Sequence, residues 1–80
     1  MTYVYLLQSL PHPDERYIGV TSDVCRRLAE HNAGKSPHTA RFAPWRLVAY
    51  TGFADRGRAA QFERYLKSGS GRAFASRHLW

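Results

Sequence analysis

The chain has 80 residues, of which 12 are Lys or Arg and 6 are Asp or Glu, so its formal net charge is +6 at pH 7. This length predicts one domain, residues 1–80, and the content of 44% hydrophobic and 14% aromatic residues favours a folded domain over a disordered tail. One cysteine excludes an internal disulfide and a multi-cysteine zinc site, and no segment approaches the roughly 20 apolar residues that cross a bilayer, so we expect a cytoplasmic protein without a membrane partner.

The chain starts with a predicted β-hairpin. Residues 2–9 are rich in Tyr, Val and Leu, residues 11–15 (PHPDE) are a dense turn signal, and residues 16–20 (RYIGV) resume a strand pattern. Side chains alternate along a strand, so Tyr5 and Tyr17 each share a face with the residues two positions away. A register that pairs these two faces makes Tyr5 and Tyr17 neighbours.

A helix is predicted to follow the hairpin. Residues 21–23 (TSD) are good cap residues, and the helix runs to about Asn32, shortly before a glycine. At 100° per residue, the expected buried stripe comprises Val24, Cys25, Leu28 and Ala29. Arg27 and His31 lie one turn apart along the border of this stripe, between core and water.

The second half of the chain is predicted to contain one strand and two helices. In order, it has a polar loop at 35–44, a strand at 45–53 (WRLVAYTGF), a helix at 55–68 and a short helix at 70–80. Asp55 is the expected cap of the first helix, and Gly69 is its expected end. The inner face of this helix comprises Ala59, Phe62 and Leu66. Glu63 lies at the border of that face.

Glu63 is the acidic residue that the local sequence leaves unexplained. The other acidic residues lie in the hairpin turn, at helix caps, or on a solvent face among basic neighbours. A carboxylate in the middle of a helix beside a buried stripe is either paired with an arginine or bound to a metal, and the ion pair is the more common arrangement. The residues alone leave both interpretations open.

Tyr5, Tyr17, His31 and Cys25 also have structural explanations when taken singly. Tyrosine is common in half-buried strands, a histidine one turn after an arginine is often at a solvated edge, and Cys25 fits a small core position. The four histidines show no metal-ligand spacing. No one of these residues identifies a functional site.

The basic residues indicate a phosphate-bearing partner. Ten of the 12 are arginine, whose guanidinium group matches phosphate through paired hydrogen bonds. Nucleic acid is therefore the first partner to consider, and a basic protein without such a partner is the alternative.

Several motifs together resemble the GIY-YIG nuclease domain family over nearly the whole chain. They are Tyr3-Val4-Tyr5, Tyr17-Ile18-Gly19, Arg27-Leu28, His31-Asn32 and Glu63. Compact stand-alone bacterial members are the most similar, and these are similar to the nuclease module of UvrC-type excision-repair enzymes and to Slx1-type structure-specific nucleases. The first motif departs from the family pattern, because it begins with Tyr3 where the family has glycine.

This resemblance implies a fold and a set of site residues. The expected fold is α/β, of the α+β type, with a small central three-stranded antiparallel sheet flanked by helices. The implied catalytic residues are Tyr5, Tyr17, Arg27, His31 and Glu63. Tyr5 is expected to act as the base and Tyr17 to orient water or phosphate, with Arg27 on the phosphate and His31 as a hydrogen-bond donor or proton relay. Glu63 is implied as a ligand of one divalent metal ion, Mg²⁺ or Mn²⁺.

The expected function is metal-dependent endonuclease activity on DNA in repair or recombination, with cleavage directed by structure more than by sequence. RNA as a substrate stays open, and we expect a monomer or weak dimer. Additional nucleic-acid contacts are expected from Lys35, His38, Arg41 and Lys67. One alternative is a non-catalytic nucleic-acid-binding module with the same fold, and another is a basic structural protein with an ion pair between Arg27 and Glu63.

Overall fold

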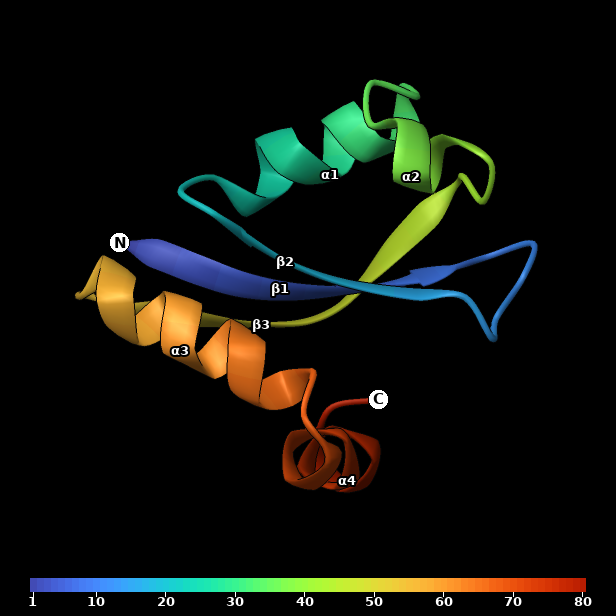
Figure 1. Cartoon of the computed structure of the whole chain (residues 1–80). Coiled ribbons are helices and arrows are strands. Elements are labelled where there is room, and N and C mark those ends of the chain that lie inside the picture. Colours follow the sequence, from blue (N-terminus) through green and yellow to red (C-terminus); the bar gives the residue numbers. More distant parts are fainter.

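Three antiparallel strands form the centre of the molecule, and four helices cover the two faces of the sheet (Figure 1). The computed structural model describes residues 1–80. In chain order its elements are β1 (Thr2–Ser9), β2 (Arg16–Thr21), α1 (Val24–Asn32), α2 (Pro37–Ala40), β3 (Trp45–Phe53), α3 (Arg56–Leu66) and α4 (Gly69–His78). The strand order is β2-β1-β3. This confirms the predicted α+β fold with a three-stranded antiparallel sheet.

The register of the hairpin brings the two motif tyrosines together. Tyr5 lies opposite Gly19, and Leu7 lies opposite Tyr17. Tyr5 and Tyr17 are therefore diagonal neighbours on one face, and their ring centroids are 6.1 Å apart. The strand β2 forms one edge of the sheet, so Tyr17 lies at an open side of the molecule.

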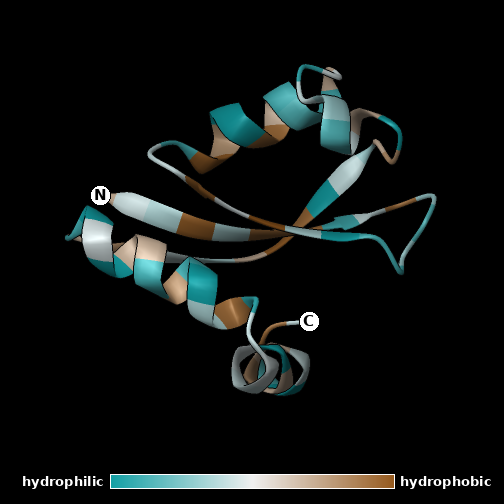
Figure 2. Ribbon diagram, viewed as in Figure 1, coloured by the Kyte–Doolittle hydropathy of each residue, from teal (hydrophilic) through white to brown (hydrophobic).

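The alternation of side chains along β1 divides the core into two clusters. Val4 and Leu6 pack with residues of α3 and α4, whereas Tyr5 and Leu7 pack on the opposite face with residues of α1 and with Trp45. Figure 1 shows α1 and α2 on one side of the sheet and α3 and α4 on the other. In Figure 2, α1 and α2 are largely hydrophilic, and the most hydrophobic stretches are in the strands. The core cluster on the α3 and α4 side has five buried residues, and the one on the α1 side has three.

Helix α1 packs through a narrower stripe than the sequence predicts. Its cap is confirmed, because the Asp23 side chain accepts a hydrogen bond from the Arg26 backbone N–H. However, Cys25 and Ala29 are exposed, which contradicts their predicted place in the core. Val24, Leu28 and His31 lie at spacings of four and three residues, within about 60° of one another around the helix, and they pack against the sheet. The prediction that His31 borders water is also wrong, because it is fully buried.

The predicted polar loop contains a short helix. Pro37 stands at the first turn of α2, where its missing N–H has no helical partner to lose. This turn directs Thr39 inward, so that only 2% of Thr39 is exposed. The loop therefore supplies a buried polar group to the α1 side of the sheet, which the sequence pattern did not predict.

The junction between α3 and α4 also differs from the prediction. Helix α3 ends at Leu66 instead of Ser68, and the Ser68 side chain caps α4 by accepting a hydrogen bond from the Gly71 N–H. Gly69 therefore begins α4 instead of ending α3. A Cβ at Gly71 would lie 1.7 Å from the Tyr65 carbonyl oxygen, so only glycine permits this close crossing. None of the four helices has the length and hydrophobicity to cross a bilayer.

Candidate active site

A buried chain of hydrogen bonds links β1 to α1 and α2. The Tyr5 hydroxyl lies 2.9 Å from His31 Nε2, and His31 Nδ1 lies 2.7 Å from Thr39 Oγ1. These three residues are 1%, 0% and 2% exposed. Every buried side-chain N and O atom in the structure has a hydrogen-bond partner, so this polar cluster is fully satisfied despite its burial.

The direction of the hydrogen bonds follows from Thr39. Its hydroxyl donates to the Ser36 carbonyl oxygen, 3.4 Å away, and so it accepts from Nδ1–H of His31. The Nε2 atom of a neutral ring then accepts the proton of the Tyr5 hydroxyl. Burial, and secondarily the nearby charge of Arg27, lowers the pKa of His31 below its ordinary value, which favours this neutral ring. His31 is thereby held as an acceptor for Tyr5.

Gly19 makes room for the Tyr5 hydroxyl beneath β2. A Cβ at Gly19 would lie 2.6 Å from the Tyr5 hydroxyl oxygen and 2.7 Å from the ring carbon that carries it. Any larger residue would displace the ring and break its bond to His31. The glycine of the Tyr17-Ile18-Gly19 motif therefore has a steric reason, namely close approach of a side chain to the backbone.

Tyr17 joins the same cluster from the edge of the sheet. Its ring meets the His31 ring edge-on, with centroids 4.9 Å apart. Unlike Tyr5, it is only half-buried, because it lies on the edge strand β2. Tyr17 is therefore the motif tyrosine that solvent can reach.

Arg27 stands between the buried cluster and water. Its side chain is 34% exposed, and its Nη1 atom lies 3.0 Å from Glu30 Oε1. Glu30 also pairs with Arg26, at 3.4 Å, and its pKa is lowered chiefly by its hydrogen bond to Arg27. Burial raises the pKa of Tyr5 above its ordinary value of 10.0, while Arg27 acts in the opposite direction. Arg27 is thus the cation that favours ionisation of Tyr5.

Glu63 lies on α3, on the other side of the sheet from α1. Its Oε2 atom accepts a hydrogen bond from Lys67 Nζ one turn along the same helix, and its side chain is 23% exposed. The partner of Glu63 is thus a lysine on its own helix, instead of the arginine that the ion-pair interpretation expected. An ion pair between Arg27 and Glu63, expected for a purely structural protein, is not formed, because α1 and α3 lie on opposite sides of the sheet (Figure 1).

The donor set around Glu63 fits a metal ion that is shared with a substrate. No group of three or more His, Cys, Asp or Glu side chains in the structure could hold a metal ion. A Mg²⁺ ion typically binds one or two carboxylates, and waters and substrate phosphates complete its octahedron. A single, partly buried carboxylate fits that arrangement once Lys67 turns away from it.

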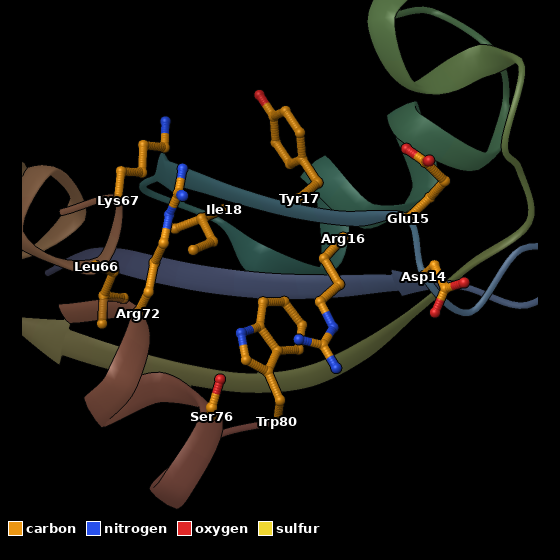
Figure 3. A pocket seen from close by; sticks show the side chains of 10 residues that line it. All are labelled: Asp14, Glu15, Arg16, Tyr17, Ile18, Leu66, Lys67, Arg72, Ser76 and Trp80. Atoms are coloured by element: carbon orange, nitrogen blue, oxygen red, sulfur yellow. The ribbon is translucent and has the colours of Figure 1, made fainter. Parts of the chain in front are cut away.

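A groove of about 620 Å³ runs along the β2 edge between the hairpin and the C-terminal helices (Figure 3). Its lining residues are Asp14, Glu15, Arg16, Tyr17, Ile18, Leu66, Lys67, Arg72, Ser76 and Trp80. Tyr17 and Lys67 both line it, and Lys67 is the partner of Glu63. The lining of the groove therefore includes one residue of the tyrosine cluster and the lysine that pairs with Glu63, whereas Glu63 itself lies outside the lining.

The structure separates the predicted nucleic-acid contacts. Lys67 lines the groove, whereas Lys35, His38 and Arg41 are exposed around α2 and do not line it. Three groove residues, Arg16, Arg72 and Trp80, were not predicted, and neither was the role of Thr39 in holding His31. A tryptophan and two arginines flanking the motif elements were visible in the sequence, but only the packing of α4 beside β2 brings them together.

Three comparisons with known proteins were informative. Residues 1–75 match the family model described as the GIY-YIG catalytic domain. The chain is 44% identical over 71 residues to the structure-specific endonuclease subunit SLX1 of Meyerozyma guilliermondii and 50% identical over 68 residues to that of Scheffersomyces stipitis. These matches cover 80% and 75% of this chain but only 24% and 20% of the two relatives. The solution structure of UPF0213 protein BH0048 from Bacillus halodurans superposes with a TM-score of 0.55 at 32% identity, covering 96% of this chain and 84% of that one.

Proposed function

Since the chain belongs to the GIY-YIG catalytic domain family, we propose that it is an endonuclease that hydrolyses phosphodiester bonds in DNA with the help of one divalent metal ion. The observation that carries the proposal is the buried chain from Tyr5 through His31 to Thr39, with Arg27 and Tyr17 at its open end. A purely structural core has no need of so many polar groups, because each costs desolvation. The cluster instead resembles a set of groups arranged to move a proton beside an anionic substrate.

Tyr17 is the better candidate for the base that takes a proton from the attacking water. It is half-exposed, whereas Tyr5 is 1% exposed and its hydroxyl is bonded to His31. We therefore exchange the roles expected from the sequence, where Tyr5 was the base. The Tyr5 hydroxyl is bonded to Nε2 of His31, and the ring of Tyr17 lies against both residues, so a proton received by Tyr17 has a path through Tyr5 to His31.

Arg27 and Glu63 act on the phosphate from the two sides of the sheet edge. The Arg27 guanidinium would bind the phosphoryl oxygens and stabilise the extra negative charge of the transition state. The Glu63 carboxylate would hold the metal ion after losing its bond to Lys67. When bound, a divalent ion such as Mg²⁺ or Mn²⁺ supplies Lewis-acid stabilisation of the phosphate and leaving oxygen. Lys67, once released, would remain near the phosphate as a further cation.

The substrate class is proposed from the relatives and from the size of the domain. The yeast relatives are named structure-specific endonuclease subunits, and this chain corresponds to a fraction of their length. An 80-residue domain has little surface for reading base sequence, and its net charge of +6 favours contacts with phosphate. We therefore propose cleavage directed by DNA structure, in repair or recombination, with affinity that falls as salt rises.

The first test is nicking of supercoiled plasmid by the wild type and by Glu63→Gln, with Mg²⁺, with Mn²⁺ and with EDTA. We expect nicking by the wild type only with metal, and a loss of about 1000-fold in the variant, because Glu63 is the single protein ligand. Arg64→Gln is the matched control on the same helix. Arg64 is exposed, does not line the groove and forms no ion pair, so cleavage and its metal requirement should stay close to those of the wild type.

Three outcomes would contradict this proposal. Cleavage by Glu63→Gln close to the wild-type rate would remove Glu63 from the metal site. Cleavage by the wild type in EDTA would remove the metal. DNA binding without cleavage of plasmid or of branched DNA under any of these conditions would identify the domain as a non-catalytic binding module.

A further inference from the structure

The groove along β2 has an ordered distribution of charge. Its end near α3 is basic, with Lys67 and Arg72, and its other end, at the hairpin turn, is acidic, with Asp14 and Glu15 (Figure 3). Tyr17 of the proposed catalytic cluster lies on the lining between these ends. Whatever occupies the groove must therefore place negative charge near Lys67 and Arg72 and hydrogen-bond donors near the carboxylates.

The side chains of Arg16 and Trp80 both line the groove and lie one over the other. The guanidinium carbon of Arg16 is 4.7 Å from the centroid of the Trp80 ring, which is a cation–π arrangement (Figure 3). Trp80 is half-buried and packs against the core cluster under α3 and α4, so its ring is held in place from behind. Arg16 is exposed on the edge strand, and the groove borders both side chains. This pair offers a fixed, planar surface that solvent can reach.

We propose that this groove binds an unpaired nucleotide of the DNA substrate next to the scissile phosphate, with its base on the Arg16–Trp80 pair and its phosphate between Lys67 and Arg72. Unpaired bases stack on aromatic rings and on arginine guanidinium planes, and they do so in proteins that bind single strands. The proposal rests on the proposed nuclease function, because it names the feature of the substrate that this site recognises.

Two considerations favour an unpaired nucleotide over a duplex as the occupant of the groove. The groove volume of about 620 Å³ is in the range of about 300–1,000 Å³ typical of small-ligand sites, which suits one or two nucleotides and not a duplex. In a duplex the flat faces of the bases are covered by their neighbours, so only a base outside the helix can use a stacking surface.

The acidic end of the groove sets the orientation of this nucleotide. Asp14 and Glu15 repel phosphate but accept hydrogen bonds from exocyclic amino groups of bases. The phosphate is thus directed toward Lys67 and Arg72, close to Glu63. A branch or a flap, in which an unpaired segment leaves a duplex, presents this combination beside a cleavable bond.

The binding step can be tested without cleavage, by following tryptophan fluorescence in EDTA while a short oligodeoxycytidylate, whose bases carry an exocyclic amino group, or a duplex of equal length is added. We expect the single strand to quench the fluorescence of Trp80 and the duplex to cause little change, since stacking requires an unpaired base. Trp80→Phe keeps an aromatic ring for folding and should remove the change. The signal of Trp45 should stay constant, because that side chain is 4% exposed and bonded to Thr39.

Arg72→Gln tests the phosphate end, and Arg77→Gln is its matched control on the same helix. Both residues are exposed, so both variants should fold, and both lose one charge, but Arg77 does not line the groove. We expect Arg72→Gln to weaken binding of the single strand by about tenfold, the effect of one charge-assisted contact, and Arg77→Gln to weaken it much less. With active enzyme, Arg72→Gln should slow cleavage of a flap substrate more than nicking of plain duplex.

Equal effects of the two arginine variants would overturn the proposal, as would equal quenching by the duplex and the single strand. A wild-type protein that quenches as expected but cleaves nothing would contradict the nuclease function while supporting the groove as a single-strand site. Cleavage of all substrates at unchanged rates in Arg72→Gln and Trp80→Phe would overturn the groove while supporting the nuclease.

Discussion

The two faces of the sheet are built from the same strand but carry different chemistry. Under α3 and α4, Val4 and Leu6 form an apolar core, and the nearby Glu63 lies at its border, paired with Lys67. Under α1 and α2, Tyr5 takes part in a buried polar chain with His31 and Thr39. One face therefore stabilises the fold by excluding water, and the other uses part of its buried volume to hold functional groups in fixed positions.

This difference shows how a domain of 80 residues can accommodate a buried polar site. The polar groups on the α1 side are all satisfied by one another or by backbone, so their burial does not leave an unpaired donor or acceptor. The apolar face under α3 and α4 needs no such partners and carries the larger cluster of buried residues. Four of the five proposed catalytic residues lie on the α1 side of the sheet, and Glu63 lies on the other side. In the proposed mechanism, both groups act on the phosphate at the β2 edge.

The largest expected effect is on the cleavage rate, and it distinguishes Tyr17 from Tyr5 on the α1 side of the sheet. Tyr17→Phe should slow cleavage by about 1000-fold, the typical contribution of a general base, with little change in stability because Tyr17 is half-buried. Tyr5→Phe should slow it less, but should also lower stability by roughly 1–3 kcal/mol, because Nε2 of His31 loses its buried partner. Single-turnover rates and urea unfolding measure the two effects. A slower rate in Tyr5→Phe than in Tyr17→Phe would return the role of base to Tyr5.

The second prediction concerns stability and cleavage after substitution of two adjacent leucines that face opposite sides of the sheet. Leu6 and Leu7 are 1% and 0% exposed, so Leu6→Ala and Leu7→Ala should each cost roughly 2–5 kcal/mol of unfolding free energy. Leu7 packs in the same cluster as Tyr5 and Tyr17, whereas Leu6 packs under α3 and α4. We expect cleavage per folded molecule to fall in Leu7→Ala and to stay near the wild-type rate in Leu6→Ala. Equal losses of activity would mean that the two faces are not functionally separate.

The smallest expected effect is a dependence of stability on pH, which arises from His31 on the α1 side of the sheet. Burial lowers the pKa of His31 below its ordinary value of 6.5, so the unfolded chain binds more protons than the folded protein between these two pKa values. Stability should therefore be fully present above pH 6.5 and decrease as pH falls below it. Urea midpoints between pH 7.5 and pH 5 measure this before the carboxylates titrate. Exposed His38→Gln should keep the pH dependence, and a wild-type midpoint that rises on acidification would contradict the burial of His31 in its neutral form.

Much of the fold followed from local patterns. The hairpin, the strand at 45–53 and the cap of α1 at Asp23 were predicted within one or two residues, because turn residues, alternation and caps act over short distances. The predictions were wrong where the burial of a residue depends on contact between elements that are distant in the sequence. Cys25 and Ala29 face water because α1 contacts the sheet through a narrow stripe. The segment that starts at Pro37 was predicted as a loop, but it forms a short helix that directs Thr39 inward.

The sequence by itself determined the order of the elements, the face of each strand residue and the set of motif residues, because each depends on neighbours in the chain. The tertiary structure decided which of these residues meet. The lowered pKa of His31, the room that Gly19 leaves for Tyr5 and the groove lined by Arg16, Arg72 and Trp80 all depend on packing between segments remote in sequence. Burial and hydrogen bonding set the chemistry of a side chain, and both exist only once the chain has folded.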